Sequence, residues 1–241
     1  MRSALVALAL VAIATGCAPV VPSMVGGRTT PLDSHELGGG AAMRIPLGDL
    51  APPQSAGTEL EALALSGPGG VSPVAWWRYG FDRGWDVALL AAGASLRAEL
   101  RGSTPLAAFT RLIVGASAYG GYAWAEPREA IRGGDGARFG ALVPVAIGID
   151  MAGAAELWLG VRAGFEHFEG ALYGAGVSAD ALHLTTLRAG PLVGLAVGIR
   201  PLHVMVELIC DIEHVRGALA DAPIERTGVA LVPGFALRFR L

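Results

Sequence analysis

The residues best suited to chemistry are few and widely separated in the sequence. His203, Glu207 and Asp211 follow one another at intervals of four, so in an extended strand their side chains point to the same side. Imidazole and carboxylate groups on one face can bind a metal ion or move protons. They can equally be polar side chains that satisfy one another in a protein interior, and we favour this second interpretation.

Two other groups give weaker signals. Ser178, Asp180 and His183 are close in the sequence and have the side chains of a hydrolase triad, but their spacing has no specificity. The run Gly38-Gly39-Gly40 lacks the lysine of a phosphate-binding loop. The sequence therefore predicts no catalytic residue, no cofactor and no metal site, and we do not expect an enzyme.

The composition points to a membrane protein. Hydrophobic residues make up 53% of the 241 residues, charged residues only 16%, and 35 residues are glycine. A soluble protein this poor in charge would have difficulty covering its surface. Beyond the N-terminus, uncharged runs such as Phe139–Ile149 reach about 11 residues, whereas a membrane-spanning helix needs roughly 20. Only helices and closed barrels satisfy every backbone group in lipid, so a β-barrel remains.

Charge and cysteine content exclude other classes. The net charge is −3, all 18 basic residues are arginine, and they alternate with acids instead of clustering, which argues against nucleic-acid binding. The cysteines, Cys17 and Cys210, do not form a disulfide framework. We expect Cys210 to be a small apolar residue on the lipid-facing side.

The N-terminus has the features of an export signal. Arg2 precedes an apolar stretch, Ala4–Thr15, which is too short to span a membrane and has the length of a signal-peptide core. The following Ala14-Thr15-Gly16-Cys17 resembles the lipobox of bacterial lipoproteins, although leucine is commonest at the place of Ala14. Small residues before a cysteine also occur in ordinary signal peptides.

The lipobox resemblance has specific implications. It implies a signal peptide over residues 1–16 and a fatty acid such as palmitate on Cys17, which becomes the new N-terminus. In lipoproteins generally, aspartate at the next position favours inner-membrane retention, so Ala18 implies the outer membrane, with the lipid on its periplasmic side. Residues 17–34 carry several prolines and no period, which predicts a lipidated N-terminus followed by an extended linker.

From residue 35 to 241 the sequence repeats one pattern. Bulky apolar residues alternate with small or polar ones, as in strands with one face toward lipid and the other toward a barrel lumen. The last segment runs to Leu241 and looks like the C-terminal signal strand that the insertion machinery of outer-membrane barrels reads, which usually ends in phenylalanine. Six long segments show the pattern: Ala107–Trp124, Ala137–Met151, Ala155–Glu169, Leu182–Arg200, Leu202–Arg216 and Arg226–Leu241.

The strand count rests on weaker segments as well. Seven strands are expected from residue 84 onward, and Pro73–Phe81 precedes them, within a phrase, RYGFDRGWDV, that looks similar to a recurring element of small outer-membrane barrels. His35–Leu47 and Thr58–Ser66 bring the count to ten, with eight or twelve as alternatives. The expected short turns are residues 101–105, 150–156 and 200–202, and the expected long loops are residues 126–136, 170–181 and 217–225. The prediction is an all-β, antiparallel, transmembrane up-and-down barrel.

The predicted inward face carries charges of both signs. A barrel of eight to ten strands has an interior that side chains can fill, and buried charges need partners. This predicts either a salt-bridged plug, which we favour, or a narrow polar pore. The expected lumen charge network is Arg78, Arg97, Glu99, Arg111, Asp150, Glu156, Arg162, Glu166, Arg188, Glu207, Asp211 and Arg238.

These observations leave three functional hypotheses. The leading one is a monomeric outer-membrane barrel lipoprotein with a structural, binding or minor-pore role. Its partners would be outer-membrane lipid, the barrel-insertion machinery and the lipoprotein-sorting machinery. The alternatives are a soluble periplasmic β-sandwich lipoprotein that binds a partner or apolar ligand, and a barrel enzyme that acts on membrane lipid.

Overall fold

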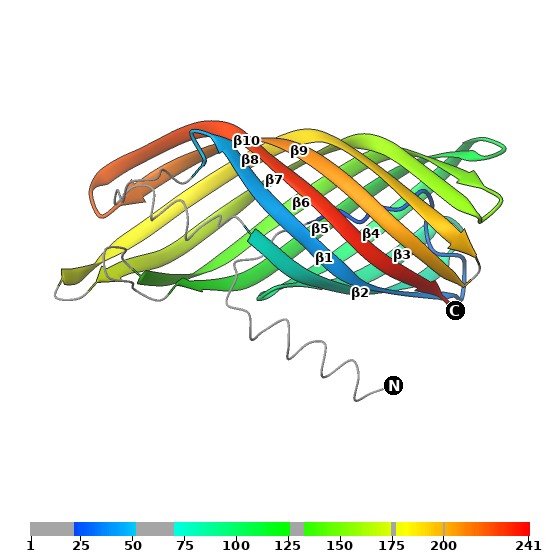
Figure 1. The fold of residues 1–241 in the computed structure, drawn as a ribbon, viewed down its shortest axis with the longest axis horizontal. Helices are drawn as coiled ribbons and strands as arrows, with labels where there is room; N and C mark the ends of the chain where they lie inside the picture. The colour runs from blue at the N-terminus through cyan, green and yellow to red at the C-terminus, as the bar shows by residue number, and fades with distance from the viewer. Residues whose placement is uncertain (1–21, 52–69, 126–132, 175–176, 200) are drawn as a thin grey trace, which may run out of the picture.

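Ten antiparallel strands close into one barrel (Figure 1). The computed structural model describes residues 22–51, 70–125, 133–174, 177–199 and 201–241, with only the backbone of Val177 and Ser178. Each strand pairs with the next along the chain, and the first pairs with the last. The strands are β1 (His35–Gly48), β2 (Gly70–Asp82), β3 (Trp85–Ala92), β4 (Ser95–Ala107), β5 (Thr110–Ala125), β6 (Gly133–Met151), β7 (Ala155–Gly174), β8 (Val177–Ile199), β9 (Leu202–Leu219) and β10 (Ala222–Arg240).

Closure of the sheet decides between the predicted architectures. Leu37 pairs with Phe239 and Leu47 pairs with Val229, so β1 and β10 remain in register along most of their length. A closed up-and-down sheet has no free edge, whereas a sandwich consists of two sheets. The predicted ten-stranded up-and-down barrel is confirmed, and the alternative sandwich is wrong.

The ten strands are not the ten that the pattern predicted. The expected strand Thr58–Ser66 lies outside the described residues. The region after residue 84, expected to begin with one strand, contains both β3 and β4, joined by a turn at Gly93, whose φ is +54°. This turn is so short that the apolar alternation continues through it, which hides the boundary.

Three predicted connections are wrong for the same reason. The expected long loop at residues 170–181 is mostly strand, because β7 extends to Gly174, β8 begins at Val177, and Ala171 pairs with Ala181. The expected turn at residues 101–105 lies inside β4, where Ser103 pairs with Ile113. The expected long loop at residues 217–225 is mostly strand, with Pro223 paired to Ala218 and a tight turn at Ala220, whose φ is +49°. These strands extend beyond the level of the lipid layer, where outward side chains can be polar or small. The apolar alternation therefore ends before the strand does.

The two ends of the barrel differ. At one end, here called the turn end, the connections are tight and the chain terminus pairs with the start of β1 through bonds between His35 and Leu241 of 2.8 and 3.1 Å. At the other, the loop end, lie the ends of β5 and β6, β7 and β8, and β9 and β10. The wall is uneven here, because β3 has 8 residues and β8 has 23.

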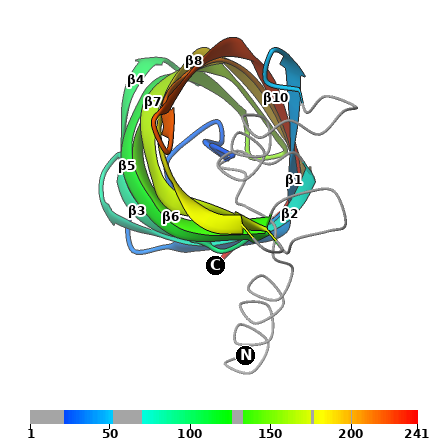
Figure 2. The same cartoon turned by 90° about the vertical axis from the view of Figure 1, so that its left-hand side faces the viewer.

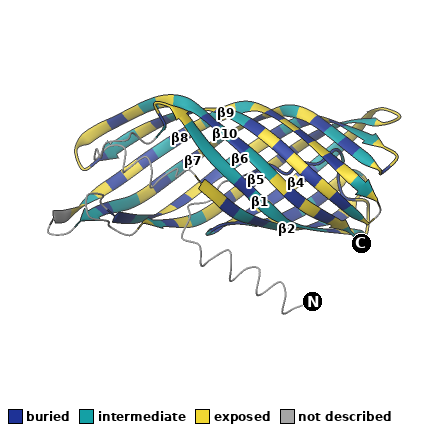
Figure 3. Cartoon of the chain, in the orientation of Figure 1, coloured by how far each residue is buried: buried dark blue, intermediate teal, exposed yellow. Residues whose placement is uncertain are grey.

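The barrel surface alternates as the sequence predicts (Figure 3). Apolar side chains face outward over the central part of every strand, and inward neighbours are buried, which is the pattern of a transmembrane barrel. On the outside, His35, Trp77 and Tyr79 stack near the turn end, and Tyr122 and Trp124 lie together near the loop end. Such aromatic pairs mark the two membrane–water interfaces. In the described part of the chain, no helix is long and apolar enough to cross a membrane.

Candidate functional site

The N-terminal residues before β1 lie inside the barrel. Residues Pro22–Thr30, here called the lumen segment, enter at the turn end and reach the middle of the ring (Figure 2). Met24 and Val25 are completely buried, and Thr30 is 1% exposed. The sequence predicted an extended linker here. The segment instead turns within the lumen, where Met24 and Gly26 have φ values of +46° and +73°, and its backbone groups hold it in the interior.

Glu207 on β9 holds the centre of the lumen segment. Its Oε1 accepts hydrogen bonds from the backbone N–H groups of Ser23 (2.9 Å) and Met24 (2.7 Å), and its Oε2 accepts one from Val25 (3.2 Å). The indole Nε1 of Trp158 donates to Oε2 at 3.1 Å. One buried carboxylate therefore satisfies three successive backbone donors and fixes the height of the segment in the barrel.

Arginines from the opposite wall bind the carbonyl groups of the same segment. Strands β2 and β4 supply three guanidinium groups, which lie across the lumen from Glu207. An arginine of β7 adds a bond to a side chain. The contacts are Arg78 Nη2 to Met24 O at 2.5 Å, Arg97 to Pro22 O at 2.6 Å and to Ser23 O at 2.9 Å, Arg101 Nη1 to Val25 O, and Arg162 Nη1 to Ser23 Oγ at 3.2 Å.

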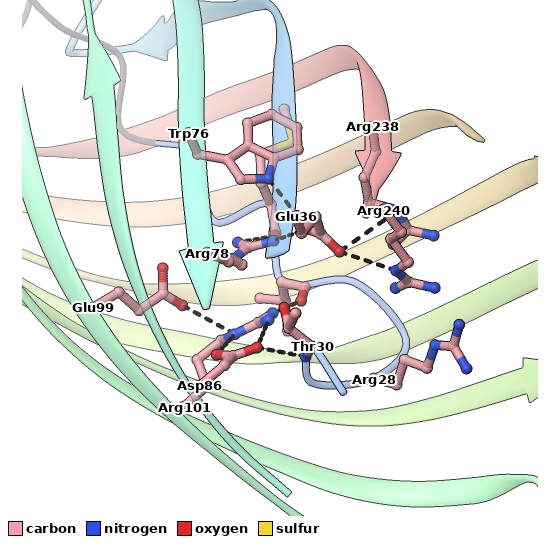
Figure 4. Close-up of polar contacts among 12 residues, drawn as sticks. Arg28, Thr30, Glu36, Trp76, Arg78, Asp86, Glu99, Arg101, Arg238 and Arg240 are labelled. Atoms are coloured by element: carbon pink, nitrogen blue, oxygen red, sulfur yellow. Dashed lines mark hydrogen bonds and ion pairs between the residues drawn. The ribbon is translucent and has the colours of Figure 1, made fainter. Parts of the chain in front are cut away.

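A second charge cluster closes the turn end (Figure 4). The carboxylate of Glu36, which is 1% exposed, accepts hydrogen bonds from Arg78 Nη1 at 2.8 Å and Arg240 Nε at 3.1 Å. Glu156 accepts from Arg238 Nη1 at 2.9 Å and Arg240 Nη1 at 2.5 Å. These groups come from strands β1, β2, β7 and β10, so the cluster ties the two ends of the sheet together where the barrel closes.

The part of the lumen segment nearest the turn end, residues 27–30, joins the charge cluster at the turn end. Gly27 donates its N–H to Glu156 at 3.2 Å, and Arg28 forms an ion pair with Asp150 at 2.8 Å. Thr30 donates its N–H to Asp86 at 2.7 Å, and Asp86 also accepts from Arg101. The segment is therefore bound at both its middle and its turn-end part, and residues 31–34 connect it to β1.

Two glycines make room for the tryptophans of these clusters. A Cβ on Gly194 would lie 2.1 Å from the indole of Trp158, and a Cβ on Gly38 would lie 2.0 Å from the indole of Trp76. Both indoles donate to a carboxylate of the network, Trp158 to Glu207 and Trp76 to Glu36, each at 3.1 Å. The absence of a side chain on the neighbouring strand lets each ring lie across the interior.

The structure places most of the predicted charge network in the interior. Arg162 pairs with Asp211, Arg97 pairs with Glu99 at 3.0 Å, and Arg188 lies 3.4 Å from Glu166. Asp150 lies at the turn end and is partly exposed. Arg111 is half-buried on the inward side of β5, and no ion pair joins it to another residue in the ranges described. The other predicted members, Arg78, Glu156, Glu207 and Arg238, take the positions given above.

Sequence reasoning missed several members of the network. The sequence did carry a signal for the missed residues that belong to strands. Each of them either lies an even number of residues from a predicted member of the same strand or lies on the strand face opposite the apolar side chains. Arg101 continues the series Arg97 and Glu99, and Glu213 continues Glu207 and Asp211. The missed residues are Arg28, Glu36, Arg44, Asp86, Arg101, Arg138, Glu213 and Arg240.

The residues that could have done chemistry are not assembled for it. His203 is buried, and its Nε2 lies 2.8 Å from the backbone carbonyl of Gly153, while Glu207 and Asp211 are engaged as described. His183 lies outside, 3.9 Å from Glu169, and the side chain of Ser178 is not described. In the part of the chain that the structure covers, no group of three His, Cys, Asp or Glu could hold a metal ion. Cys210 is a free, partly exposed thiol.

Comparisons with known proteins give structural likenesses only. No family model and no curated protein matches this chain. Ail, the attachment invasion locus protein of Yersinia pestis, is 13% identical, with a TM-score of 0.34 over 88% of this chain and 100% of Ail.

Two other solved structures are similar to the same degree. The complex of Ail with the heparin analogue sucrose octasulfate has 12% identity, a TM-score of 0.36 and the same coverage. The neisserial surface protein NspA has 12% identity and a TM-score of 0.33 over 85% of this chain and 96% of NspA. We draw no functional conclusion from likenesses of this size.

Proposed function

We propose that this chain is an outer-membrane β-barrel that its own N-terminal segment closes, with a structural or binding role and no conduction. The observation that carries the proposal is the lumen segment, three of whose successive N–H groups bond to the buried Glu207. A barrel of this size is filled by side chains alone or holds one small ligand. Here a stretch of backbone occupies the turn-end half, in addition to the arginines that bind it.

The outer membrane is the compartment that the pattern favours. The outward apolar belt, the aromatic pairs at both interfaces and the export signal in the sequence are the properties of barrels of the bacterial outer membrane. The strand order agrees, because an even number of strands leaves both ends of the sheet at the turn end. Short turns on the periplasmic side are the convention for such barrels, so the loop end would face outward.

Conductance in planar bilayers tests the closed-barrel proposal. We expect no discrete conductance steps from the full-length protein, and steps from a variant in which residues 22–30 are deleted. Glu225→Gln, which removes a negative charge from the outer surface, serves as the matched control and stays closed. Steps from the unaltered protein would contradict the proposal. A deletion variant that folds and stays closed would show that the lumen segment is not what closes the barrel.

Lipidation of Cys17 is a separate part of the proposal. The predicted signal peptide and Cys17 lie outside the described residues. Metabolic labelling with palmitate tests this: the protein takes up label and Cys17→Ser does not. Equal labelling of both would refute lipidation at Cys17 and leave the closed barrel untouched.

A further inference from the structure

The strand pair that closes the ring, β1 with β10, is here called the seam. Its pairing is interrupted at residues 43–44, opposite residues 232–233, and neither Pro46 nor Pro233 has an N–H group to donate. β1 also contains the run Gly38-Gly39-Gly40, and glycine weakens the interior of a strand. The seam joins the first strand to the last, which is the costliest loop of the sheet to close in chain entropy. This pair therefore gains most from additional contacts.

The lumen segment is linked to both strands of the seam through shared side chains. Arg78 donates hydrogen bonds to a backbone carbonyl of the segment at 2.5 Å and to Glu36 of β1 at 2.8 Å (Figure 4). Glu156 accepts from the N–H group of Gly27 at 3.2 Å and from Arg238 of β10 at 2.9 Å. One side chain therefore binds both the segment and β1, and another binds both the segment and β10.

The wall of the barrel has no side chains where the chain passes closest to it. A Cβ on Gly148 of β6 would lie 2.1 Å from the backbone oxygen of Gly27. A Cβ on Gly80 of β2 would lie 2.0 Å from the backbone oxygen of Pro31, the residue that follows the segment. In turn, a Cβ on Gly27 would lie 2.8 Å from Cβ of Glu156. Backbone therefore contacts backbone on two sides of the ring, and the fit leaves no slack.

The direction of the chain makes entry into a finished ring unfavourable. Residues 31–34 join the segment to β1 at the turn end, and its other end, Pro22, lies inside the ring. To enter after closure, Pro22 and every residue before it would have to pass Arg101 and Glu207, which are 1% and 3% exposed. The backbone groups would lose water before they reached their partners. On an open sheet, the same groups can approach the inner face from the side while water still reaches them.

We propose that the lumen segment docks on the inner face of the sheet no later than the seam forms, and that the ring closes around it. The docked segment positions Arg78 and Glu156, and these hold Glu36 and Arg238 where β1 and β10 meet. The segment is then a device of assembly that speeds closure, besides being part of the filling of the lumen. The proposal rests on the place and contacts of the segment, so it holds whether or not the barrel conducts.

Refolding of the full-length protein from urea into vesicles of dilauroylphosphatidylcholine tests the order of events. Pulses of hydrogen exchange, read by mass spectrometry, report when each part of the chain becomes protected. We expect the amides of residues 22–30 to gain protection before those of residues 37–47 and 229–239, or together with them. Protection of the seam while residues 22–30 still exchange freely would overturn the proposal, and this measurement needs no variant.

Two variants test whether docking speeds closure. Glu207→Gln leaves two buried N–H groups of the lumen region without an acceptor, and Gly148→Ala places a methyl group against the backbone of the segment. In both we expect the seam to gain protection between about threefold and about 30-fold more slowly, while β8 and β9 pair at the unaltered rate. Glu225→Gln and Gly120→Ala, on the outer surface, are the matched controls and should leave both rates unchanged. Closure of the seam at the unaltered rate in either test variant would overturn the assisting role of the segment.

Discussion

Replacing Glu207 by glutamine should release the lumen segment while the ten strands remain paired in a ring. The substitution keeps the size of the side chain but turns one oxygen into a hydrogen-bond donor. Oε1 accepts from Ser23 and Met24, and Oε2 accepts from Val25 and Trp158. Whichever way the amide points, two buried N–H groups lose their acceptor.

The size of the effect follows from those two groups. A buried donor without a partner costs about 1–3 kcal/mol, so the docked state should lose about 2–6 kcal/mol relative to the released one. The lower figure corresponds to roughly a 30-fold change in the equilibrium between them. The strands pair through backbone bonds that do not involve Glu207 side-chain atoms, so their stability should change little.

Hydrogen exchange measured by mass spectrometry follows the segment directly. We expect amide protection in residues 22–30 to fall at least about 30-fold in Glu207→Gln, with the protection of β6–β9 retained. Glu225→Gln, which makes the same change on the outside of β10, should match the unaltered protein. Unchanged protection of the segment in a folded Glu207→Gln barrel would refute the claim that this carboxylate holds it. Loss of protection throughout would refute the claim that the segment docks separately.

Three further predictions address the barrel itself. Gly194→Ala should destabilise the protein by about 1–3 kcal/mol in urea unfolding, because the new methyl group overlaps the indole of Trp158, whereas Gly120→Ala, where the nearest atom is 3.8 Å away, should not. Glu36→Gln should cost about 3–5 kcal/mol in the same assay, because it removes the carboxylate that the buried Arg78 pairs with and one of the two that pair with Arg240, and a loss no larger than that of Glu225→Gln would contradict the structure. In a Cys210→Ser background, Ala41→Cys with Phe235→Cys should form a disulfide under oxidation, because these residues are paired, and Ala41→Cys with Val229→Cys should not; the gel shift of the linked barrel is the readout.

Much of the fold could be predicted because a strand with one face toward lipid carries apolar side chains at every second position. Along β9, Val204, Val206 and Leu208 face outward while Glu207 and Asp211 face inward, and this alternation is visible in the sequence alone. The same parity identified most of the buried charges. It failed where the chain reverses in two residues, as at Gly93, because the alternation continues through so short a turn.

The lumen segment could not be predicted, because its own side chains carry no signal for its place. Ser23, Met24 and Val25 are held through their N–H and C=O groups, which every residue possesses, and the groups that recognise them lie between 50 and 190 residues away. Their meeting depends on the ring that the ten strands form.

The sequence by itself determined that this protein is a chain of strands with an apolar face for lipid and a charged face for a lumen, since both properties are local and repeat along each strand. Only the tertiary structure decided what fills that lumen. The filling depends on which inward side chains share a height in the barrel. That height is set by the register between strands, as in the pairing of Glu166 with Thr186 and of Arg188 with Glu213, and no single strand contains this information.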